Sequence, residues 1–279
     1  MNDDPLGKKI AYVLRHAPQG LASGLLGDEA QLRLDLVQAR RGLLHQLSGL
    51  LPRPLWLQLA LPYRALREGL DLVHTTNFAV PLLAPCPTVV TLHDLGPFTQ
   101  PELTPALRRA YLRAMVPLAV RRARVVIAPS EATAADARRL LGLDDTKLRV
   151  IPEAAEARFA PAPEAEQLRV REQHGLRGPY VLAVGSVQAR KNLLRLCQAM
   201  ASLQATHPGL ELVLVGPGPL AAELQAPFVR ALGYVADADL PGLYSAAQAV
   251  AYVSLGEGFG LPALEALACG APLVASRLP

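Results

Sequence analysis

Cysteine is scarce in this chain of 279 residues. Its three cysteines, Cys86, Cys197 and Cys269, are far apart and odd in number, so neither a disulfide framework nor a cysteine-bound metal cluster is indicated. Each has apolar neighbours, and we expect buried thiols in a reducing cytoplasm. The first residues, MNDDPLGKK, also lack the apolar core and the cleavage site of a secretory signal. The sequence therefore favours a cytoplasmic location.

Long apolar runs and aromatic residues are also few. Hydrophobic residues make up 51% of the chain, enough for the cores of two domains, yet no uninterrupted run is long enough to span a bilayer. Only 5% of the residues are aromatic and no stacking motif is present. Nucleic acid is therefore not an expected partner.

Positive charge is concentrated in the first half of the chain. Residues 1–151 hold 19 Lys and Arg against 13 Asp and Glu, whereas residues 152–279 hold 9 against 11. Six arginines around one expected helix supply much of the excess: Arg108, Arg109, Arg113, Arg121, Arg122 and Arg124. Such a face could attract phosphate-bearing lipids at the inner face of the membrane, or an anionic acceptor. The alternative is an ordinary solvated helix surface.

Short β-branched runs alternate with helical stretches from residue 70 onward. These runs are 71–74, 88–92, 124–130 and 148–152, and later 180–186, 211–216, 228–235 and 248–254. Strands that alternate with helices predict parallel sheets with right-handed crossovers. We therefore expect an α/β protein with two doubly wound, Rossmann-like domains that bind ligand at the carboxyl ends of their strands.

Composition predicts the domain boundaries. Residues 152–179 are rich in Pro and Glu without an apolar period, which indicates a linker with at most one short helix. The first domain is then 1–151 and the second is 180–279. Within the first domain we expect a strand at 9–14, a helix at 31–47 and a further helix that Ser130 caps.

The stretch 255–276, LGEGFGLPALEALACGAPLVAS, carries the strongest functional pattern. Three glycines precede Pro262, which suits the first turn of a helix, and Gly270 suits a left-handed cap after it. The N–H groups of a helix N-terminus favour phosphate, and the flanking glycines let the backbone approach a ligand. Glu257 and Glu265 can each accept hydrogen bonds from vicinal sugar hydroxyls. The combination predicts a sugar-nucleotide pocket, and the alternative is a capped core helix with solvated acids.

The spacing of these two acids is also that of a known family. EGFGLPALE resembles the E-x7-E signature of the retaining GT-B glycosyltransferases of family 4, and ALACGAPLVAS resembles its usual continuation. The segment VGSVQARKN at 184–192 is similar to the family's VG-x4-RKN, with Ser186 where many relatives carry an arginine. The resemblance covers residues 71–279.

This resemblance implies a fold and a reaction. The fold would be GT-B, two Rossmann-like doubly wound domains facing a cleft, with the second domain incomplete at its C-terminal end. The reaction would be a retaining, metal-independent transfer of a hexose to a glycan or lipid-linked acceptor, as in polysaccharide biosynthesis. The donor would be a nucleoside-diphosphate sugar such as GDP-mannose or a UDP-sugar, and no separate cofactor or metal is expected.

The resemblance also implies roles for particular residues. Glu257 would orient the donor sugar and Glu265 the ribose, while Lys191 and Arg190 would bind the diphosphate. Fixed cations suit that position because the leaving group gains charge as the glycosidic bond breaks. Backbone groups would contact sugar or phosphate at four further positions: Gly185, Phe259, Gly260 and Leu261.

His93 is the candidate from the first domain. It follows a strand in TVVTLHDLGPF, and relatives carry the same HDL with the histidine facing the transferred sugar. A lone histidine at a strand end is otherwise a structural residue. His74 is a weaker candidate on the acceptor side. Two other functions stay open, a non-catalytic nucleotide- or partner-binding fragment and a GT-B sugar-nucleotide epimerase, because fold alone does not fix function.

Overall fold

The structure is a computed structural model that describes residues 10–13, 55–76 and 78–278. The chain divides into two compact units, Met1–Glu153 and Ala154–Pro279. Each unit is built around a five-stranded parallel sheet, which confirms the predicted α/β class. Within the described ranges, no helix has the length and apolar character needed to cross a lipid bilayer.

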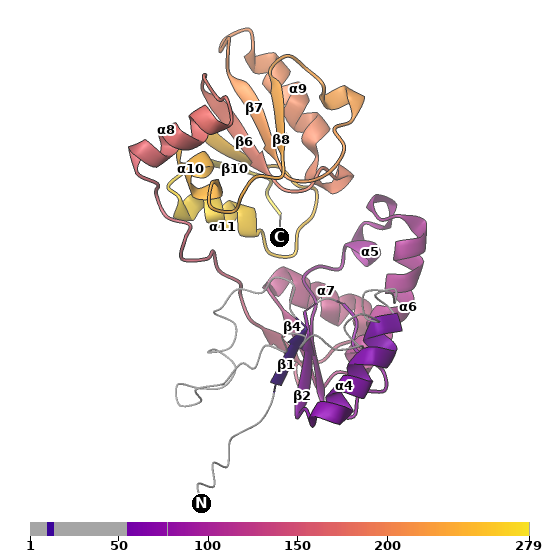
Figure 1. Ribbon diagram of the computed structural model, residues 1–279. Helices are drawn as coiled ribbons and strands as arrows, with labels where there is room; N and C mark the ends of the chain where they lie inside the picture. Colours follow the sequence, from indigo (N-terminus) through magenta and orange to yellow (C-terminus); the bar gives the residue numbers. More distant parts are fainter. Residues whose placement is uncertain (1–9, 14–54, 77, 279) are drawn as a thin grey trace, which may run out of the picture. The chain divides into compact units, whose positions relative to one another are not determined.

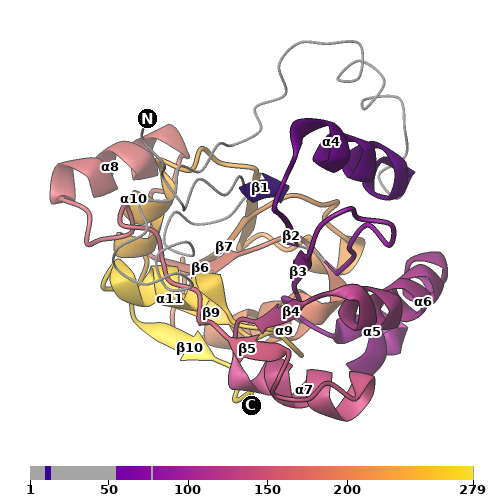
Figure 2. The same ribbon diagram turned by 90° about the horizontal axis from the view of Figure 1, so that it is seen from below.

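The sheet of the first unit has its strands in chain order, β1-β2-β3-β4-β5. Figure 2, a view from below, shows β1 to β5 following one another in this order. The strands are β1 Ile10–Val13, β2 Leu72–Thr75, β3 Thr88–Thr91, β4 Val125–Ala128 and β5 Leu148–Val150. Every residue of β3 is buried, as expected of a parallel strand that is covered on both faces.

Helices connect these strands. They are the π-helical turn η1 Trp56–Ala60, α4 Leu61–Glu68, α5 Gly96–Thr99, the 3-10 turn η2 Pro101–Leu103, α6 Ala106–Arg122 and α7 Glu131–Leu141. The apolar side of α6 packs Leu112 and Val116 into a core that also contains Val90 and Val126 from the sheet. The predicted cap is confirmed, since Ser130 Oγ accepts a hydrogen bond of 3.1 Å from the Thr133 N–H.

The sheet of the second unit has the order β10-β9-β6-β7-β8. Its strands are β6 Tyr180–Val184, β7 Glu211–Val215, β8 Val229–Gly233, β9 Ala249–Tyr252 and β10 Leu273–Ala275. The chain moves from β6 outward to β8 and then returns to lay β9 on the other side of β6. This reversal of direction creates a switch point between β6 and β9.

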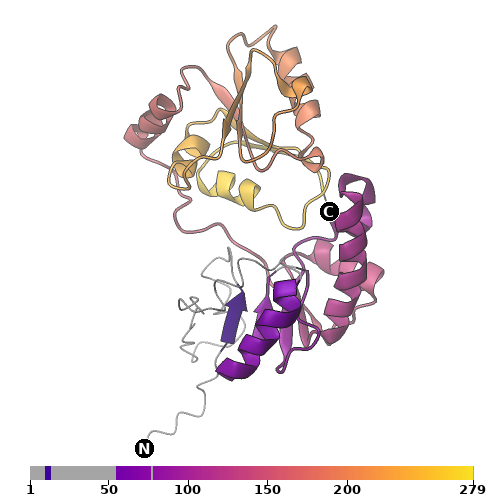
Figure 3. The same cartoon turned by 45° about the vertical axis from the view of Figure 1, so that its right-hand side comes forward.

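Helices cover both faces of this sheet (Figures 1 and 3). They are α8 Glu164–Gln173, α9 Leu193–Leu203, α10 Leu240–Ser245 and α11 Leu261–Ala268, with 3-10 turns η3 Ala189–Lys191 and η4 Ala222–Leu224. Adjacent strand residues point to opposite faces. Leu182 therefore joins the core under α8, α10 and α11, whereas Ala183 joins the core under α9.

The segment predicted as a linker, 152–179, is instead part of the second unit from residue 154 onward. It contains α8, and it buries Phe159, Val170 and Leu176 in the core of that unit. Composition concealed this packing because Val170 is the one buried residue in an otherwise polar helix. The predicted helix at 31–47 lies outside the described residues, whereas β1 lies within the strand predicted at 9–14.

Candidate active site

The candidate site lies at the carboxyl edge of the second sheet, where β6 and β9 run side by side. Val181 pairs with Ala249 and Leu182 with Val250, so the two parallel strands end at the same edge. In open parallel sheets, ligands bind outside the strand carboxyl ends at such a switch point. The loops that follow, 185–192 and 253–260, contain six of the predicted residues, Gly185, Arg190, Lys191, Glu257, Phe259 and Gly260, whereas Leu261 and Glu265 lie in α11 and His93 lies in the first unit.

The structure brings Glu257, Lys191 and Arg190 together. Lys191 Nζ donates to Glu257 Oε1 at 2.7 Å, and Arg190 Nη1 lies 2.6 Å from Glu257 Oε2. The side chains of Lys191 and Glu257 are only 11% and 13% exposed. Each carboxylate oxygen thus has its own cation in a largely buried setting, where charge-assisted hydrogen bonds are strong.

Burial and charge act against each other in this cluster. Burial alone would raise the pKa of Glu257, but the hydrogen bonds from Lys191 and Arg190 outweigh it and lower that pKa. Burial lowers the pKa of Lys191, and the hydrogen bond to Glu257 only partly offsets this. Removal of Glu257 would therefore leave the buried Lys191 without its counter-ion, whereas removal of one cation would leave Glu257 paired with the other.

Backbone contacts tie the two loops to each other. The N–H of Leu255 donates to the carbonyl of Arg190 at 2.8 Å, and Asn192 Nδ2 donates to the carbonyl of Val253 at 3.2 Å. Arg190 Nη1 also donates to the carbonyl of Gly256 at 3.3 Å. The geometry of the ion-pair cluster is therefore set by the loops and not only by flexible side chains.

Two glycines allow this close approach. A Cβ on Gly185 would lie 3.2 Å from Cε of Lys191, and a Cβ on Gly216 would lie 2.2 Å from the carbonyl oxygen of Gly185. Both residues have positive φ, 141° and 137°, which side chains disfavour. Gly216 begins the Gly-Pro-Gly-Pro turn after β7, so this turn packs against Gly185 at the start of the loop that carries Lys191.

The glycine-rich loop ends at the start of α11, as predicted. Gly260 is the N-cap residue with φ 106°, and Pro262 lies in the first turn, where its missing N–H costs no hydrogen bond. Gly270 follows the helix with φ 74°, which confirms the predicted left-handed cap. The segment Phe259–Leu261 therefore leads directly into a helix N-terminus, which carries the positive end of the helix dipole.

A buried tyrosine of the core holds the Glu265 carboxylate by a hydrogen bond. The hydroxyl of Tyr244 donates to Glu265 Oε2 at 2.8 Å, and Tyr244 is fully buried. Burial raises the pKa of Glu265, while the bond from Tyr244 acts in the opposite direction. The carboxylate that was predicted to bind ribose is thus oriented through one oxygen by α10, and Tyr244 does not use the other oxygen.

Tyr252 belongs to the site and was missed by the sequence analysis. It is the last residue of β9, is 9% exposed, and has its ring centroid 5.1 Å from Nζ of Lys191. Within the described part of the chain its buried hydroxyl has no hydrogen-bond partner at normal distance, although Glu257 and Ser254 act on it electrostatically. Burial and the nearby Glu257 carboxylate raise its pKa. A tyrosine in an apolar strand gives no signal in the sequence, so only the fold reveals this contact.

His93 lies in the first unit at the carboxyl end of β3. Its Nδ1 is 2.9 Å from Oε1 of Glu153, and its side chain is 43% exposed while that of Glu153 is 8% exposed. The hydrogen bond to Glu153 raises the pKa of His93, although burial opposes the shift. Glu153 was not predicted, because it lies in the segment expected to be a linker.

His74 has a structural role in the described residues. It is 3% exposed, and its Nε2 lies 2.9 Å from Oγ1 of Thr91 on the adjacent strand. Burial, with a contribution from His93, lowers the pKa of His74 to about 4. Asp94 likewise serves the fold, since its Oδ1 accepts a bond of 2.9 Å from the N–H of Gly96 at the start of α5.

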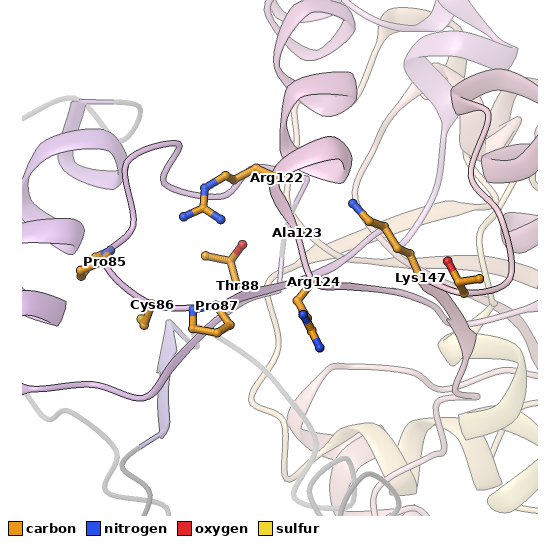
Figure 4. Close-up of a pocket in the computed structure, with 9 residues that line it drawn as sticks. Pro85, Cys86, Pro87, Thr88, Arg122, Ala123, Arg124 and Lys147 are labelled. Atoms are coloured by element: carbon orange, nitrogen blue, oxygen red, sulfur yellow. The ribbon is translucent and has the colours of Figure 1, made fainter.

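A cavity of about 660 Å³ lies at the other edge of the first sheet, where β3, β4 and β5 begin (Figure 4). Its cationic side chains, Arg122, Arg124 and Lys147, point in different directions (Figure 4). Arg122 and Lys147 are bound to backbone carbonyls. Arg122 donates to Leu82 and Ala84, and Lys147 donates to Arg121. None of the residues predicted for the site lines this cavity, which therefore does not replace the β6–β9 edge as the candidate site.

The described residues contain no group of three or more His, Cys, Asp or Glu side chains arranged to hold a metal ion. Asp237 and Asp239 are spaced as in an Asp-x-Asp motif, but both take part in ion pairs. Asp239 accepts from Arg169 at 2.6 Å and also contacts His174, and Asp237 pairs with Arg158 at 3.4 Å. The contacts of Asp239 join α8 to the start of α10, and that of Asp237 joins the segment before α8 to the segment before α10, so both acids have structural partners.

Comparison with known proteins identifies the family. A family model described as "Glycosyltransferase Family 4" matches residues 15–157, and one described as "Glycosyl transferases group 1" matches residues 178–279. O-antigen chain mannosyltransferase B of Escherichia coli is 32% identical over 226 residues, which cover 77% of this chain and 59% of that protein. D-inositol 3-phosphate glycosyltransferase of Salinispora arenicola is 39% identical over 158 residues, covering 48% of this chain and 35% of that protein.

Solved structures show the same fold. Sucrose-phosphate synthase from Thermosynechococcus elongatus matches with a TM-score of 0.63 and 26% identity, over 82% of this chain and 63% of its own. Anabaena HepE in complex with UDP-glucose matches with a TM-score of 0.65 and 25% identity, over 83% and 65%. The chain thus spans less than two thirds of the length of the mannosyltransferase and of both solved proteins. The family model over its first half, together with two parallel α/β sheets and these structural matches, shows that the chain belongs to glycosyltransferase family 4, with a GT-B fold.

Proposed function

We propose that this protein is a retaining, metal-independent hexosyltransferase that uses a nucleoside-diphosphate sugar. The observation that carries the proposal is the cluster of Lys191, Arg190 and Glu257 at the β6–β9 edge, in the loops next to α11. A departing nucleoside diphosphate gains charge as the glycosidic bond breaks, so fixed cations stabilise the transition state. Two such cations supply the neutralisation that a divalent metal provides in other transferases, which supports metal independence.

Each residue has a proposed task. Lys191 and Arg190 bind the diphosphate, Glu257 orients the donor sugar, and Glu265 accepts hydrogen bonds from the ribose hydroxyls. His93 supports the transferred sugar from the first unit. Backbone groups of Gly185 and of the segment 259–261 contact sugar or phosphate at the start of α11. Retention of the anomeric configuration is proposed from family membership.

The donor and the acceptor are proposed from the relatives. The names of several relatives describe them as O-antigen or serotype-specific mannosyltransferases, and HepE was solved with UDP-glucose. We therefore propose GDP-mannose or a UDP-sugar as donor and a glycan or lipid-linked acceptor. Contact of the arginine-rich α6 with an anionic membrane is part of the same proposal, as is a cytoplasmic location.

The test is a donor survey. The chain is incubated with UDP-glucose, UDP-galactose, GDP-mannose and ADP-glucose, and release of the nucleoside diphosphate is measured with and without EDTA. We expect one donor to be consumed at a rate that EDTA does not change, with the first product seen by NMR in the anomeric configuration of the donor. An inverted product or a metal requirement would contradict those parts of the proposal, and failure to release nucleoside diphosphate from any of the four donors would contradict it as a whole.

A further inference from the structure

Lys191 and Arg190 share one counter-ion within the protein, which offsets one of their two positive charges. Glu257 gives one carboxylate oxygen to each cation, at 2.7 and 2.6 Å. Any phosphate oxygen that binds these cations must displace the carboxylate or lie next to its negative charge. In a largely buried site, like charges at such distances repel strongly.

We propose that Glu257 is an internal counter-ion that competes with the donor's diphosphate for Lys191 and Arg190, and so weakens retention of the nucleoside-diphosphate product. The inference rests on the proposed function of the same site. It adds a second effect to Glu257, because the carboxylate that orients the sugar also lowers the affinity of the site for the leaving group.

Hydrogen bonds between the two loops hold Glu257 next to Lys191 and Arg190. Arg190 is bonded through its carbonyl to Leu255 and through its guanidinium to Gly256, the residue immediately before Glu257. The backbone of the two loops therefore fixes the position of the Glu257 carboxylate next to Lys191 and Arg190. Exposed surface ion pairs lack such support and contribute little.

Tyr252 explains how the carboxylate can leave the cations. Its hydroxyl is buried and makes no hydrogen bond at normal distance to any residue that the structure describes, although Glu257 and Ser254 lie close enough to shift its pKa. The hydroxyl lies 3.6 Å from where a Cβ on Gly260 would be, beneath the loop that carries Glu257. When a diphosphate binds Lys191 and Arg190, this hydroxyl can donate a hydrogen bond to the carboxylate of Glu257 that has been displaced from the cations.

The consequence concerns product release. The product nucleoside diphosphate carries more charge than the bound donor and lacks the sugar that Glu257 would hold. Glu257 then returns to the cations and favours dissociation of the product. A carboxamide in its place keeps the shape of the side chain but removes the competition.

The experiment is calorimetric titration of UDP and GDP into the wild-type chain, Glu257→Gln and Glu223→Gln. Glu223 is an exposed acid in η4, so the second variant removes the same charge from the same unit away from the site. We expect Glu257→Gln to bind the preferred diphosphate about tenfold more tightly, the scale of one charge-assisted interaction, while sugar transfer slows. Glu223→Gln should bind like the wild type.

A double-mutant cycle tests whether the gain in diphosphate affinity arises from the contact between Glu257 and the cations. In a Lys191→Met background, Glu257→Gln should gain less than it does in the wild type. Glu257→Asp keeps the charge but is too short to reach both cations, so it should gain less than Gln and still confirm the direction if Glu257→Gln folds poorly. Equal or weaker diphosphate binding by the Gln and Asp variants would overturn the counter-ion role while leaving the proposed function standing. If neither the wild type nor the variants bind UDP or GDP, this inference fails together with the proposed UDP-sugar and GDP-mannose donors, and the donor survey decides whether the proposed function stands.

Discussion

Tyr244 of α10 orients Glu265 of α11 through a hydrogen bond of 2.8 Å. The tyrosine is fully buried, so the bond lies on the core side of the carboxylate. A glutamate whose only role was to interact favourably with the helix dipole would need no such partner. That interaction operates at the protein surface and contributes about 0.3–1 kcal/mol. The arrangement fits a carboxylate held in position to accept hydrogen bonds.

Glu265→Gln should therefore weaken nucleotide binding with little change in melting temperature. The amide keeps one acceptor but places an NH2 donor where the second acceptor was, and it removes the charge. Hydrogen bonds to charged groups contribute about 1.5–3 kcal/mol, so the affinity for the preferred ribonucleotide should fall roughly ten- to hundredfold. Titration calorimetry measures the loss.

A 2′,3′-dideoxy nucleotide provides the control for Glu265. Because it lacks the hydroxyls that Glu265 is proposed to bind, the wild type and Glu265→Gln should bind it almost equally. Tyr244→Phe should lose less affinity for the ribonucleotide than Glu265→Gln does, and no affinity for the dideoxy nucleotide. The substitution removes the hydrogen bond that orients the carboxylate but leaves the carboxylate in place. An equal loss for both nucleotides would show that Glu265 does not contact the ribose.

Lys191→Met should lower nucleotide affinity and turnover together. The charge of the diphosphate is present in the bound donor and grows in the transition state, so the loss should be about 2–4 kcal/mol in kcat/KM, the scale for one preorganised partner. Arg195→Met removes an exposed positive charge from α9 in the same unit and is the matched control. Normal kinetics and unchanged nucleotide affinity in Lys191→Met would remove this residue from the site.

Gly216→Ala should destabilise the second unit and weaken donor binding. Its methyl group would lie 2.2 Å from the carbonyl oxygen of Gly185, so the two loops must separate. Gly209→Ala is the control, because Gly209 also has positive φ but a Cβ there would contact nothing within 4 Å. Strained φ alone costs about 1–3 kcal/mol, which both variants share. Thermal melts and UDP or GDP titrations should show a further loss in Gly216→Ala only.

Much of the second unit could be predicted because its strands are continuous β-branched runs. The run at 211–216 became β7 Glu211–Val215, and the Pro262 and Gly270 signals bounded α11 within a residue. Parallel strands meet at one edge, so the residues after β6 and β9 had to come together. The pairing of Lys191 with Glu257 follows from that topology.

The remaining contacts could not be predicted, because they depend on which faces of the helices and strands pack against each other. Tyr244 and Tyr252 look like core residues in sequence, and only the packing of α10 and β9 gives them polar neighbours. Glu153 lies in a Pro- and Glu-rich stretch, where one acid is indistinguishable from the next. Segment 154–179 was misassigned for a related reason, since α8 buries a single residue, Val170.

The arginines around α6 are not all available to a partner. Arg109 donates to the carbonyl of Pro101 at 2.6 Å, Arg113 lies 5.8 Å from the ring centroid of Phe98, and Arg122 is bound to two loop carbonyls. These contacts favour the view that part of the basic surface serves the fold. Membrane binding therefore has to be tested with the other three arginines.

The variant for that test replaces Arg108, Arg121 and Arg124 with glutamine. If the surface binds lipid, each arginine near it contributes roughly 1 kcal/mol, so the triple variant should lose most of its association with anionic vesicles at low salt. Exposed Leu107 and Leu118 on the same helix would add apolar contact. Pelleting with phosphatidylglycerol vesicles and with neutral vesicles gives the comparison. Equal pelleting of the wild type with both would leave α6 as a solvated surface.

His74 should make the first unit less stable in acid. Its pKa is lowered from 6.5 to about 4, first by burial and then by His93. The unfolded chain therefore binds a proton that the folded unit resists, and the contribution of neutral His74 is lost as the pH falls from 6.5 to about 4. At roughly 1.4 kcal/mol for each pKa unit, this loss amounts to about 3 kcal/mol at the acid end.

The measurement is urea unfolding followed by the fluorescence of Trp56, the only tryptophan in the chain, which lies in the same unit as His74. His74→Gln can still hydrogen bond to Thr91 but does not titrate, so it should be less stable than the wild type at pH 7.5. The difference should shrink by about 3 kcal/mol at pH 4, because only the wild type loses the histidine contribution. His207→Gln changes an exposed histidine in the second unit and should follow the wild type throughout. Since the other titrating groups, including His93, are common to both proteins, parallel curves for wild type and His74→Gln would mean that His74 ionises normally in the folded unit.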